Sequence, residues 1–369
     1  MKTWMMNVTL VVLGVAAYLG LNGYPEPGPS SSIHSSQQET ADPIWKSVSR
    51  QSPAELDRSL DSFRKLADHP FYEMTYFGNY EASPKPTETR LETTDQAALQ
   101  RMPSWGCSLF VSVGKDGQAI YGRNFDWQHN PAMLLHTHPD DGYASVSMVD
   151  ISYLGFEKDD PKLDTAKGRQ ALLYAPMIPF DGMNECGLTV GMAAVSDTKF
   201  PHAAEKPSVG GLQIIRLVLD GAQTVDEAVE IFRQNNIVIS GGPCMHYLVA
   251  DRFGKSVLIE MKDGKMHCIP GKGNWQSATN FYLTEESKPL QQCNRFASID
   301  KIMTTNEGVL DHQQAMELLE RIKQANTQWS VVYDLKLRTA KVCVSRKFDR
   351  SFDFQVTSQR KRQLAPRAR

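Results

Sequence analysis

The chain has 369 residues, of which 41% are hydrophobic, enough for one large or two modest domains with a buried core. Its formal net charge is −2, so overall charge provides no basis for binding nucleic acid, and the basic residues 358–369 are predicted to be a flexible tail. No internal repeat at a solenoid period is present.

An apolar run near the N-terminus stands apart from the rest of the chain. It extends from Trp4 to Leu21 and is interrupted only by one asparagine and one threonine. This pattern predicts an export signal or a single membrane anchor over residues 1–23, rather than a buried helix. We therefore expect a periplasmic, secreted or lumenal protein, associated with the membrane if the segment is not cleaved. Residues 24–43, rich in Pro, Ser and Gln, are predicted to be a disordered linker.

A helix is predicted to begin at Ser52, which has the sequence of an N-cap. Pro53 suits the first helical position, and Glu55 can close a capping box with Ser52. An apolar face follows at helical spacing, made by Leu56, Leu60, Phe63 and Leu66. Residues 44–106 are therefore expected to be mostly helical.

A β-hairpin is predicted next. Apolar and small polar side chains alternate over residues 108–113, which indicates a half-buried strand. Gly114-Lys115-Asp116-Gly117 is a strong turn signal, and the extended pattern resumes at Gln118.

Two registers of this hairpin fit the turn. Cys107 lies opposite Asn124 if Lys-Asp is the central pair of the turn, and opposite Asp126 if Asp-Gly is central. Asn124 and Asp126 share parity, so either register places a carboxylate near the cysteine. Strand parity places Arg123 on the opposite face, and it can join the site only if the strand bulges or ends there, which Gly122 permits.

The hairpin suggests nucleophilic chemistry at Cys107. A thiol attacks only as the thiolate, and its free pKa is about 8.5, so it needs a base or a nearby positive charge. No histidine lies on the hairpin. If the chain were cut between Gly106 and Cys107, the new α-amine, with a pKa of about 7.7–8.0, would place a base on the nucleophile's own residue. Asp126 could then hold that amine.

The rest of the chain alternates strands with paired helices. Two helices are predicted within residues 209–235, the second opening at Thr224, and a further helix over 311–325. The predicted strands are 188–195, 245–250, 256–261, 330–335 and 340–345. This order indicates an α+β domain.

Six cysteines are present, at positions 107, 186, 244, 268, 293 and 343. If Cys107 is kept for chemistry, five remain, so they cannot all pair within one chain, and most are expected to be buried as small hydrophobic residues. No Cys-x-x-Cys occurs, which gives no support to a zinc or thioredoxin-type site. No metal and no organic cofactor is expected.

Four motifs in order resemble a known family. They are Cys107-Ser108 with the following strand and Gly122-Arg123-Asn124-Phe125-Asp126-Trp127, then the segment from Asp181 to Val190, then Ala278-Thr279-Asn280-Phe281, and finally Asn294-Arg295-Phe296. Together they resemble the cysteine-type N-terminal-nucleophile (Ntn) amidohydrolases: choloylglycine hydrolases, penicillin V acylases, and the acid-ceramidase and N-acylethanolamine amidase group. The resemblance covers roughly Cys107 to Phe354.

This resemblance implies a fold and a domain plan. The fold would be a four-layer αββα sandwich of two antiparallel sheets, with the catalytic domain at residues 107–357. Residues 44–106 would be a prosegment, released or retained after the cut; an ordinary structural helix is the alternative.

The resemblance also implies roles for individual side chains. Asn280 would donate to the developing oxyanion, and Asn184 would belong to the oxyanion or substrate pocket. Arg295 would orient the thiol or Asp126. With Cys107, Arg123 and Asp126, these residues form the predicted catalytic set.

The function that follows is hydrolysis of a small-molecule N-acyl amide through a Cys107 thioester, after self-cleavage at Gly106–Cys107. The same site could instead serve an acyltransferase, or the chain could be a silent amphiphile-binding protein. Pocket residues are expected from loops 128–143 and 157–178, which carry Met133, Leu135 and Leu172. Neither the particular amide nor an oligomeric state follows from the sequence.

Overall fold

The computed structural model describes residues 43–82, 106–128, 130–239, 242–285 and 287–358, all within one compact unit. The predicted export segment lies outside these ranges. Of the predicted linker, the structure describes only residue 43, and of the predicted tail only residue 358. Among the helices in the described ranges, none has the length and hydropathy that a membrane crossing needs.

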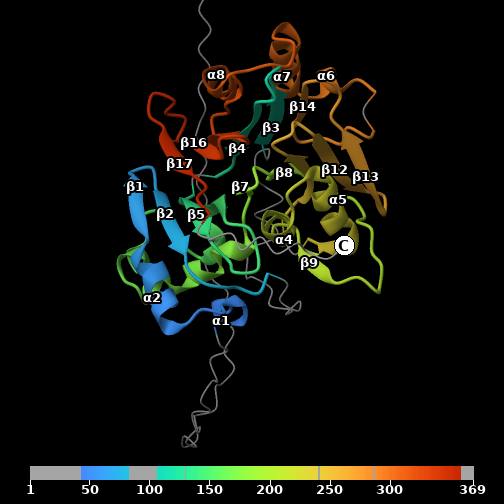
Figure 1. Cartoon of the computed structure of the whole chain (residues 1–369). Helices are drawn as coiled ribbons and strands as arrows, with labels where there is room; N and C mark the ends of the chain where they lie inside the picture. The colour runs from blue at the N-terminus through green and yellow to red at the C-terminus, as the bar shows by residue number, and fades with distance from the viewer. Residues whose placement is uncertain (1–42, 83–105, 129, 240–241, 286, 359–369) are drawn as a thin grey trace, which may run out of the picture. The chain divides into compact units, whose positions relative to one another are not determined.

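Two β-sheets lie face to face at the centre of this unit (Figure 1). The first sheet has, in spatial order, β1 (Arg64–Ala67), β2 (Phe71–Tyr76), β5 (Ala132–Thr137), β6 (Ser145–Asp150), β7 (Asp181–Asn184), β8 (Thr189–Val195), β11 (Cys244–Ala250), β12 (Ser256–Lys262) and β13 (Lys265–Pro270). The second has β14 (Trp275–Ala278), β3 (Gly106–Val113), β4 (Ala119–Asp126), β15 (Thr327–Asp334), β16 (Thr339–Val344) and β17 (Phe352–Gln355). Neighbouring strands in both sheets are antiparallel, except for the parallel pair β2–β5.

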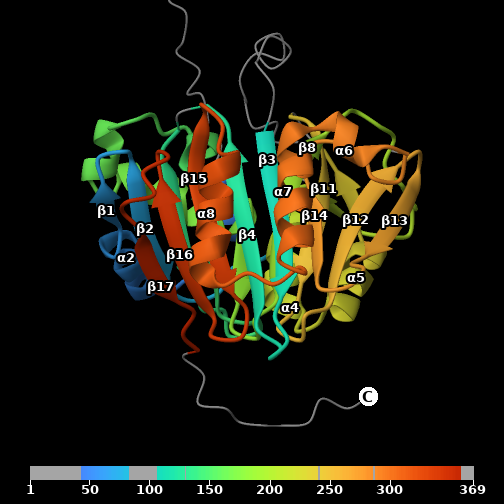
Figure 2. The same cartoon turned by 90° about the horizontal axis from the view of Figure 1, so that it is seen from above.

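Helices cover the outer face of each sheet. α7 (Asn294–Thr305) lies along β3 and β14, and α8 (His312–Ile322) lies along β4 and β15 (Figure 2). On the other side, α4 (Gln213–Gly221) packs on β7 and β8, and α5 (Val225–Gln234) packs on β11 and β12. This four-layer αββα order confirms the expected α+β class.

Most predicted elements are present. Thr224 caps α5, and Asp311 forms a capping box at the start of α8. The predicted strand pairs correspond to β11–β12 and to β15–β16. α7 was not predicted, because it has no capping signal: its N-cap residue is Cys293, whose side chain makes no capping hydrogen bond.

The central strands β3 and β4 are buried on both faces, whereas residues 108–113 of β3 were predicted to be half-buried. Leu109 faces the core shared with the first sheet, whereas Phe110 packs in the cluster under α7 and α8. The hydroxyl of Ser112 donates to the backbone oxygen of Gly308 at 2.8 Å, so its polar group is satisfied inside the protein. The outer face of β3 and β4 is buried because α7 and α8 cover it.

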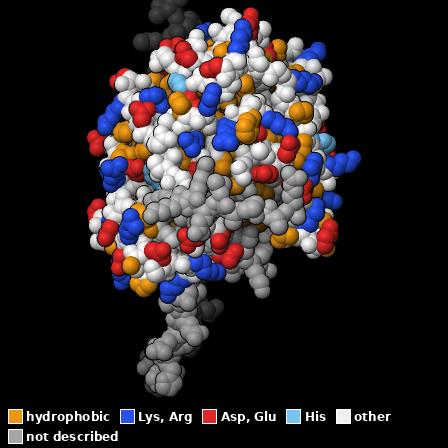
Figure 3. Space-filling model, viewed as in Figure 1, with side chains coloured by type: hydrophobic (Ala, Val, Ile, Leu, Met, Phe, Trp, Pro, Cys, Tyr) orange, Lys and Arg blue, Asp and Glu red, His pale blue; other side chains and the backbone are white. Residues whose placement is uncertain are grey.

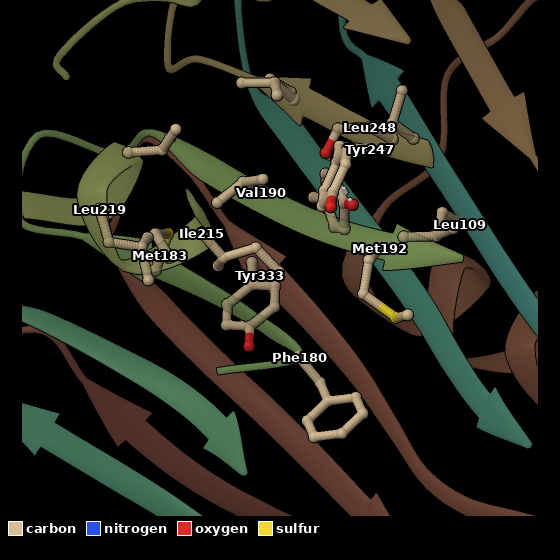
Figure 4. Close-up of a cluster of buried hydrophobic side chains, with 14 of the residues drawn as sticks. Leu109, Phe180, Met183, Val190, Met192, Ile215, Leu219, Tyr247, Leu248 and Tyr333 are labelled. Carbon is tan, nitrogen blue, oxygen red and sulfur yellow. Dashed lines mark hydrogen bonds between the residues drawn. The ribbon is translucent and has the colours of Figure 1, made fainter. Parts of the chain in front are cut away.

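The largest buried cluster joins the two sheets and the α4–α5 layer (Figure 4). It includes Leu109 from β3, Tyr333 from β15, Val190 from β8 and Leu248 from β11. Fully burying side chains of this size contributes about 1.5–3 kcal/mol each, so the central strands are rigid supports for groups at their ends.

The N-terminal segment is part of this fold. Ser52 forms the predicted capping box at the start of α2 (Pro53–Asp61), which follows the short α1 (Trp45–Val48). The helix ends earlier than predicted, and the chain continues as strands β1 and β2. Aromatic and β-branched residues in Phe71–Tyr76 favour a strand, and pairing with β5 buries it. The expectation of a mostly helical segment is corrected accordingly.

The expected pocket loops are also corrected. Met133 and Leu135 belong to strand β5, and Leu172 lies in the 3-10 helix η3 (Gly168–Met177). All three side chains are fully buried in one cluster with α2 and β2, so they are core residues rather than pocket lining. The remaining short elements are η1 (Ile151–Leu154), η2 (Pro161–Asp164), α6 (Pro289–Gln292) and the parallel pair β9 (Ser208–Gly210) and β10 (Asn236–Val238).

The face of the molecule shown in Figure 3 mixes acidic and basic side chains, with hydrophobic ones in small scattered areas. The large hydrophobic side chains that are exposed among the described residues are Val238, Phe253, Leu290 and Leu337. They come from separate parts of the fold, as single exposed apolar residues commonly do.

Candidate active site

Cys107 lies near the start of β3, where the end of β14 passes beside it. The β14–β3 ladder pairs Ala278 with Leu109, and the same register continued by two residues brings Asn280 opposite Cys107. The backbone N–H of Cys107 donates to Oδ1 of Asn280 at 2.8 Å. The thiol is buried, with 3% of the residue exposed. The Thr-Asn motif therefore reaches the nucleophile because it directly follows a strand paired with β3.

The hairpin register differs from both predicted registers. Val113 pairs with Ala119, so five residues separate the strands, and Cys107 lies opposite Phe125. A connection with an odd number of residues reverses the parity that a two-residue turn would give. Arg123 therefore shares a face with Cys107, and no bulge is needed to bring it there.

Arg123 is the charged group beside the sulfur. Its Nη2 lies 3.8 Å from Sγ of Cys107, and its Nη1 contacts the backbone oxygen of Phe180 at 2.5 Å and a carboxylate oxygen of Asp181 at 3.0 Å. Both Arg123 and Asp181 have fully buried side chains. A buried guanidinium without a counter-charge is strongly unfavourable, so Asp181 makes the placement of Arg123 possible.

Asp181 is a site residue that sequence reasoning missed. Its carboxylate also accepts hydrogen bonds from Nε1 of Trp329 at 3.2 Å and from the hydroxyl of Tyr333 at 2.5 Å. It opens the Asp-Gly-Met-Asn segment, so the sequence signal was an acidic residue directly after the apolar run Met177-Ile178-Pro179-Phe180. A carboxylate in such a strand requires a buried cation, and Arg123 provides it.

Arg295 connects the nucleophile to its neighbours from the first turn of α7. Its Nη1 donates to the backbone oxygen of Cys107 and, at 3.0 Å, to the hydroxyl of Ser108. Its Nη2 donates to Oδ1 of Asn280 at 2.9 Å. Nη1 is also 3.6 Å from Oδ2 of Asp126. Arg295 therefore contacts the backbone of Cys107 rather than its thiol, and it also lies beside Asp126; its orienting role stays a prediction.

Asp126 lies at the end of β4, directly opposite Gly106. Thr327 donates to Oδ1 of this carboxylate. A Cβ atom added at Gly106 would be 2.8 Å from Oδ2 of Asp126, closer than real Cβ contacts come. Residue 106 is thus a glycine where the acid approaches the bond that precedes Cys107.

Burial controls the ionisation of this site. Burial raises the pKa of the Cys107 thiol, and the guanidinium of Arg123 only partly opposes this effect. Burial likewise raises the pKa of Asp126 to about 6, against the hydrogen bond from Thr327 and the charge of Arg295. The thiol therefore needs a base to remove its proton, as expected for a cysteine nucleophile.

Asn184 is not at this site, which corrects the expectation for it. Its Nδ2 donates to the backbone oxygens of Leu219 at 2.9 Å and Ala222 at 2.7 Å, and its Oδ1 accepts from the backbone of Cys186 and Leu188. It organises the turn that leads into β8 and anchors that turn to α4. The contacts of Cys107 are instead near the other end of β8, about 17 Å along the strand at 3.3 Å per residue.

Asn280 can act as the oxyanion donor from its observed position. Its Nδ2 donates one hydrogen to the backbone oxygen of Ala194 at 2.8 Å. An amide nitrogen carries two hydrogens, so the second can be offered to a carbonyl oxygen bound beside Cys107. Within the described residues, no group of three or more His, Cys, Asp or Glu side chains could hold a metal ion.

A model of the acyl-coenzyme A:6-aminopenicillanic acid acyl-transferase family matches residues 112–349. The chain belongs to this family. Membership confirms the resemblance to Ntn hydrolases inferred from the four motifs. The matched range begins within β3, just after Cys107, and includes Arg123, Asp126, Asn280 and Arg295.

One curated relative matches part of this chain. Penicillin V acylase of Pectobacterium atrosepticum is 31% identical over 191 residues, which are 48% of this chain. The chain spans about half the length of that curated relative, with 50% of it covered.

Among the solved structures that resemble this chain are the following three. The penicillin V acylase of Agrobacterium tumefaciens is 18% identical, with 65% of this chain and 83% of that chain covered and a TM-score of 0.47. A mutant conjugated bile acid hydrolase of Clostridium perfringens is 14% identical, with 68% of this chain and 92% of that chain covered and a TM-score of 0.49. The Caenorhabditis elegans ortholog of N-acylethanolamine-hydrolyzing acid amidase is 15% identical, with 63% of this chain and 94% of that chain covered and a TM-score of 0.43.

Proposed function

We propose that this chain is a self-processing hydrolase of linear amide bonds with Cys107 as its nucleophile. The observation that carries the proposal is the convergence of three side chains on that residue. Asn280 accepts its backbone N–H, Arg295 donates to its backbone oxygen, and Arg123 lies beside its sulfur. Membership in an acyl-transferase family and the penicillin V acylase relative support acyl chemistry on amides.

Maturation begins with attack of the Cys107 sulfur on the carbonyl carbon of Gly106. The peptide C–N bond breaks, a thioester forms, and the freed nitrogen becomes the α-amine of Cys107. Water then cleaves the thioester, which leaves a carboxylate on Gly106 and restores the thiol. Asp126 is the acid or base closest to this bond, and its pKa of about 6 lets it exchange a proton near neutral pH.

Turnover uses the α-amine that maturation creates. The amine takes the thiol proton, and the thiolate adds to the carbonyl carbon of the substrate amide. The amide C–N bond breaks as its nitrogen takes that proton, and the acyl group remains on Cys107 as a thioester. Water then gives a proton to the α-amine and cleaves the C–S bond, which releases the acid. Asn280 holds the oxyanion while the thioester forms and again while it is hydrolysed, and it holds the α-amine between these two steps.

The proposed substrate class is N-acyl amides, which the penicillin V acylase relative supports. Acyl transfer is a second candidate, favoured by the family whose model matches: an amine replaces water in the last step. The proposal includes export through residues 1–23, which cell fractionation tests.

The experiment is intact-mass spectrometry of the purified chain, followed by a panel of N-acyl amides. Wild type should give a fragment that begins at Cys107, and that form should hydrolyse at least one amide. Cys107→Ala should stay uncut and inactive. Cys343→Ala is the control, because Cys343 is also a buried thiol, but it lies in the cluster under α8.

Three outcomes separate the alternatives. An uncut wild-type chain that still hydrolyses amides contradicts the maturation step. An uncut chain that binds amphiphiles without turnover supports a silent binding protein. A cut chain that releases acyl groups only when an added amine is present supports the transferase.

A further inference from the structure

A buried imidazole–carboxylate pair lies next to the segment that carries Asn280. His246 on β11 and Glu260 on β12 both have side chains that are 0% exposed, and Nδ1 of His246 is 3.3 Å from Oε1 of Glu260. The two strands are antiparallel neighbours, with Tyr247 paired to Ile259. Burying a charged pair is unfavourable unless further hydrogen bonds satisfy it, so its other partners matter.

Those partners all belong to the backbone and side chain of the Asn280 segment. Nε2 of His246 donates to the backbone oxygen of Thr279 at 2.7 Å. Glu260 accepts from the backbone N–H of Leu283 at 2.8 Å and of Thr284 at 3.1 Å, and from the hydroxyl of Thr284 at 2.8 Å. The pair therefore holds the chain immediately before Asn280 and again three and four residues after it.

The ionisation of the pair follows from these contacts. Burial by itself would raise the pKa of Glu260, but the hydrogen bonds from His246, Leu283 and Thr284 outweigh burial and the pKa is lowered. Glu260 is therefore a carboxylate. The second partner of the imidazole is a carbonyl oxygen, which can only accept, so Nε2 of His246 donates.

Strand pairing brings Asn280 opposite Cys107, but it does not by itself fix the orientation of the Asn280 amide. β14 ends at Ala278, and its ladder with β3 ends at Leu109. Beyond that point, side-chain hydrogen bonds hold the segment and orient the Asn280 amide. Its own three contacts, to Cys107, Arg295 and Ala194, span 2.8–2.9 Å, and a small shift of the Thr279 peptide would lengthen all of them.

We infer that His246 and Glu260 are positioning residues of the Cys107 site: they fix the Thr279–Thr284 segment so that the amide of Asn280 faces the nucleophile. Neither residue touches the reacting atoms. The effect on turnover rests on the proposed function, whereas the effect on the segment itself does not.

The first test compares two variants at one position. His246→Leu removes both ring nitrogens, and His246→Gln keeps a donor near the place of Nε2. Because one oxyanion donor is worth about 10²–10³ in kcat, its misplacement in His246→Leu should lower kcat about 10- to 100-fold, with KM within about twofold of wild type. His246→Gln should restore most of the rate. Rates are divided by the number of Cys107 thiols that iodoacetamide labels, so that partial misfolding is not counted as lost kcat.

The matched control is His312→Leu. Nε2 of His312 is 2.7 Å from Oδ2 of Asp334, so this variant also breaks a histidine–carboxylate pair, but one that is not bonded to the Asn280 segment. Its normalised kcat should stay within about twofold of wild type. A fall equal to that of His246→Leu would overturn the inference.

A double-mutant cycle separates positioning from general stability. In an Asn280→Ala background, His246→Leu should change kcat by less than about twofold, because the group that it positions is already gone. A full multiplicative loss in that background would also overturn the inference.

Hydrogen exchange provides a readout that needs no turnover. Peptides that cover residues 279–285 should lose protection at least about tenfold in His246→Leu and in Glu260→Gln, and keep it in His246→Gln and His312→Leu. If exchange follows this pattern but wild type cleaves no amide, the proposed function fails and the positioning stands. If wild type cleaves amides but exchange is unchanged in both loss variants, the positioning fails.

Discussion

The side-chain oxygen of Asn280 accepts the backbone N–H of Cys107 at 2.8 Å, although 173 positions separate the two residues. The contact exists because β14 and β3 are antiparallel and in register up to Ala278 and Leu109. After cleavage, the same oxygen would accept a hydrogen from the α-amine, so one side chain can hold the base and stabilise the oxyanion.

The first prediction concerns Asn280→Ala. Loss of the amide should lower kcat about 10²- to 10³-fold, because an oxyanion donor acts mainly in the transition state. Steady-state kinetics on the processed form measures this. Asn274→Ala is the control, since Asn274 is exposed just before β14 and should leave kcat within about twofold. Equal effects of the two variants would contradict the assigned role.

The second prediction concerns pH and Asp126. Its pKa is about 6 in the folded protein and about 3.9 in an unfolded chain, so the folded state binds more protons between these values. The contribution of Asp126 to stability is therefore complete below pH ~4 and is lost as the pH rises through about 6. Two units correspond to about 3 kcal/mol, an order-of-magnitude figure.

Urea unfolding of Cys107→Ala, which stays one chain, measures this slope. Adding Asp126→Asn should remove about 3 kcal/mol of the fall in unfolding free energy between pH 4 and pH 7. Asp116→Asn, in the exposed turn of the hairpin, should leave the slope as it was. An unchanged slope in the Asp126 variant would show that this carboxyl ionises normally.

The third prediction concerns Asp181→Asn in the same uncut background. It leaves the guanidinium of Arg123 buried without a counter-charge, which typically costs about 3–5 kcal/mol of unfolding free energy. Adding Arg123→Met should recover a large part of this loss, because the unpaired charge is then removed. Asp226→Asn breaks an exposed pair with Lys255 and should cost less than about 1 kcal/mol. Additive losses for Asp181 and Arg123 would contradict the coupling.

The fourth prediction concerns the N-terminal segment after cleavage. β2 lies between β1 and β5, and Phe71, Met74 and Tyr76 are fully buried, so the two fragments should co-elute in native size-exclusion chromatography and separate only in denaturant. Met74→Ala should lower the urea concentration at which they separate, because a buried methionine is worth about 2–5 kcal/mol. Leu337→Ala, at an exposed position, should not. Fragments that separate without denaturant would show a released prosegment.

Local patterns were sufficient for much of the fold. The capping boxes at Ser52 and Asp311 join residues three positions apart, so their formation depends on nearby atoms only. The alternation in β3 and the turn after it predicted a hairpin, but not the burial of β3 on both faces or the register of the pairing. Motif order identified Cys107, Asn280 and Arg295 as a group, because the family's chemistry requires these residue types together.

The sequence by itself therefore determined most of the elements, the α+β class and most of the side chains at the nucleophile. Only the tertiary structure decided which face of β4 carries Arg123, that Asp181 balances its charge, that Asn184 belongs to a distant turn, and that Phe71–Tyr76 joins the sheet. The physical reason is that parity, burial and charge pairing are set by contacts between residues far apart in the chain, whereas propensity and capping act within one turn.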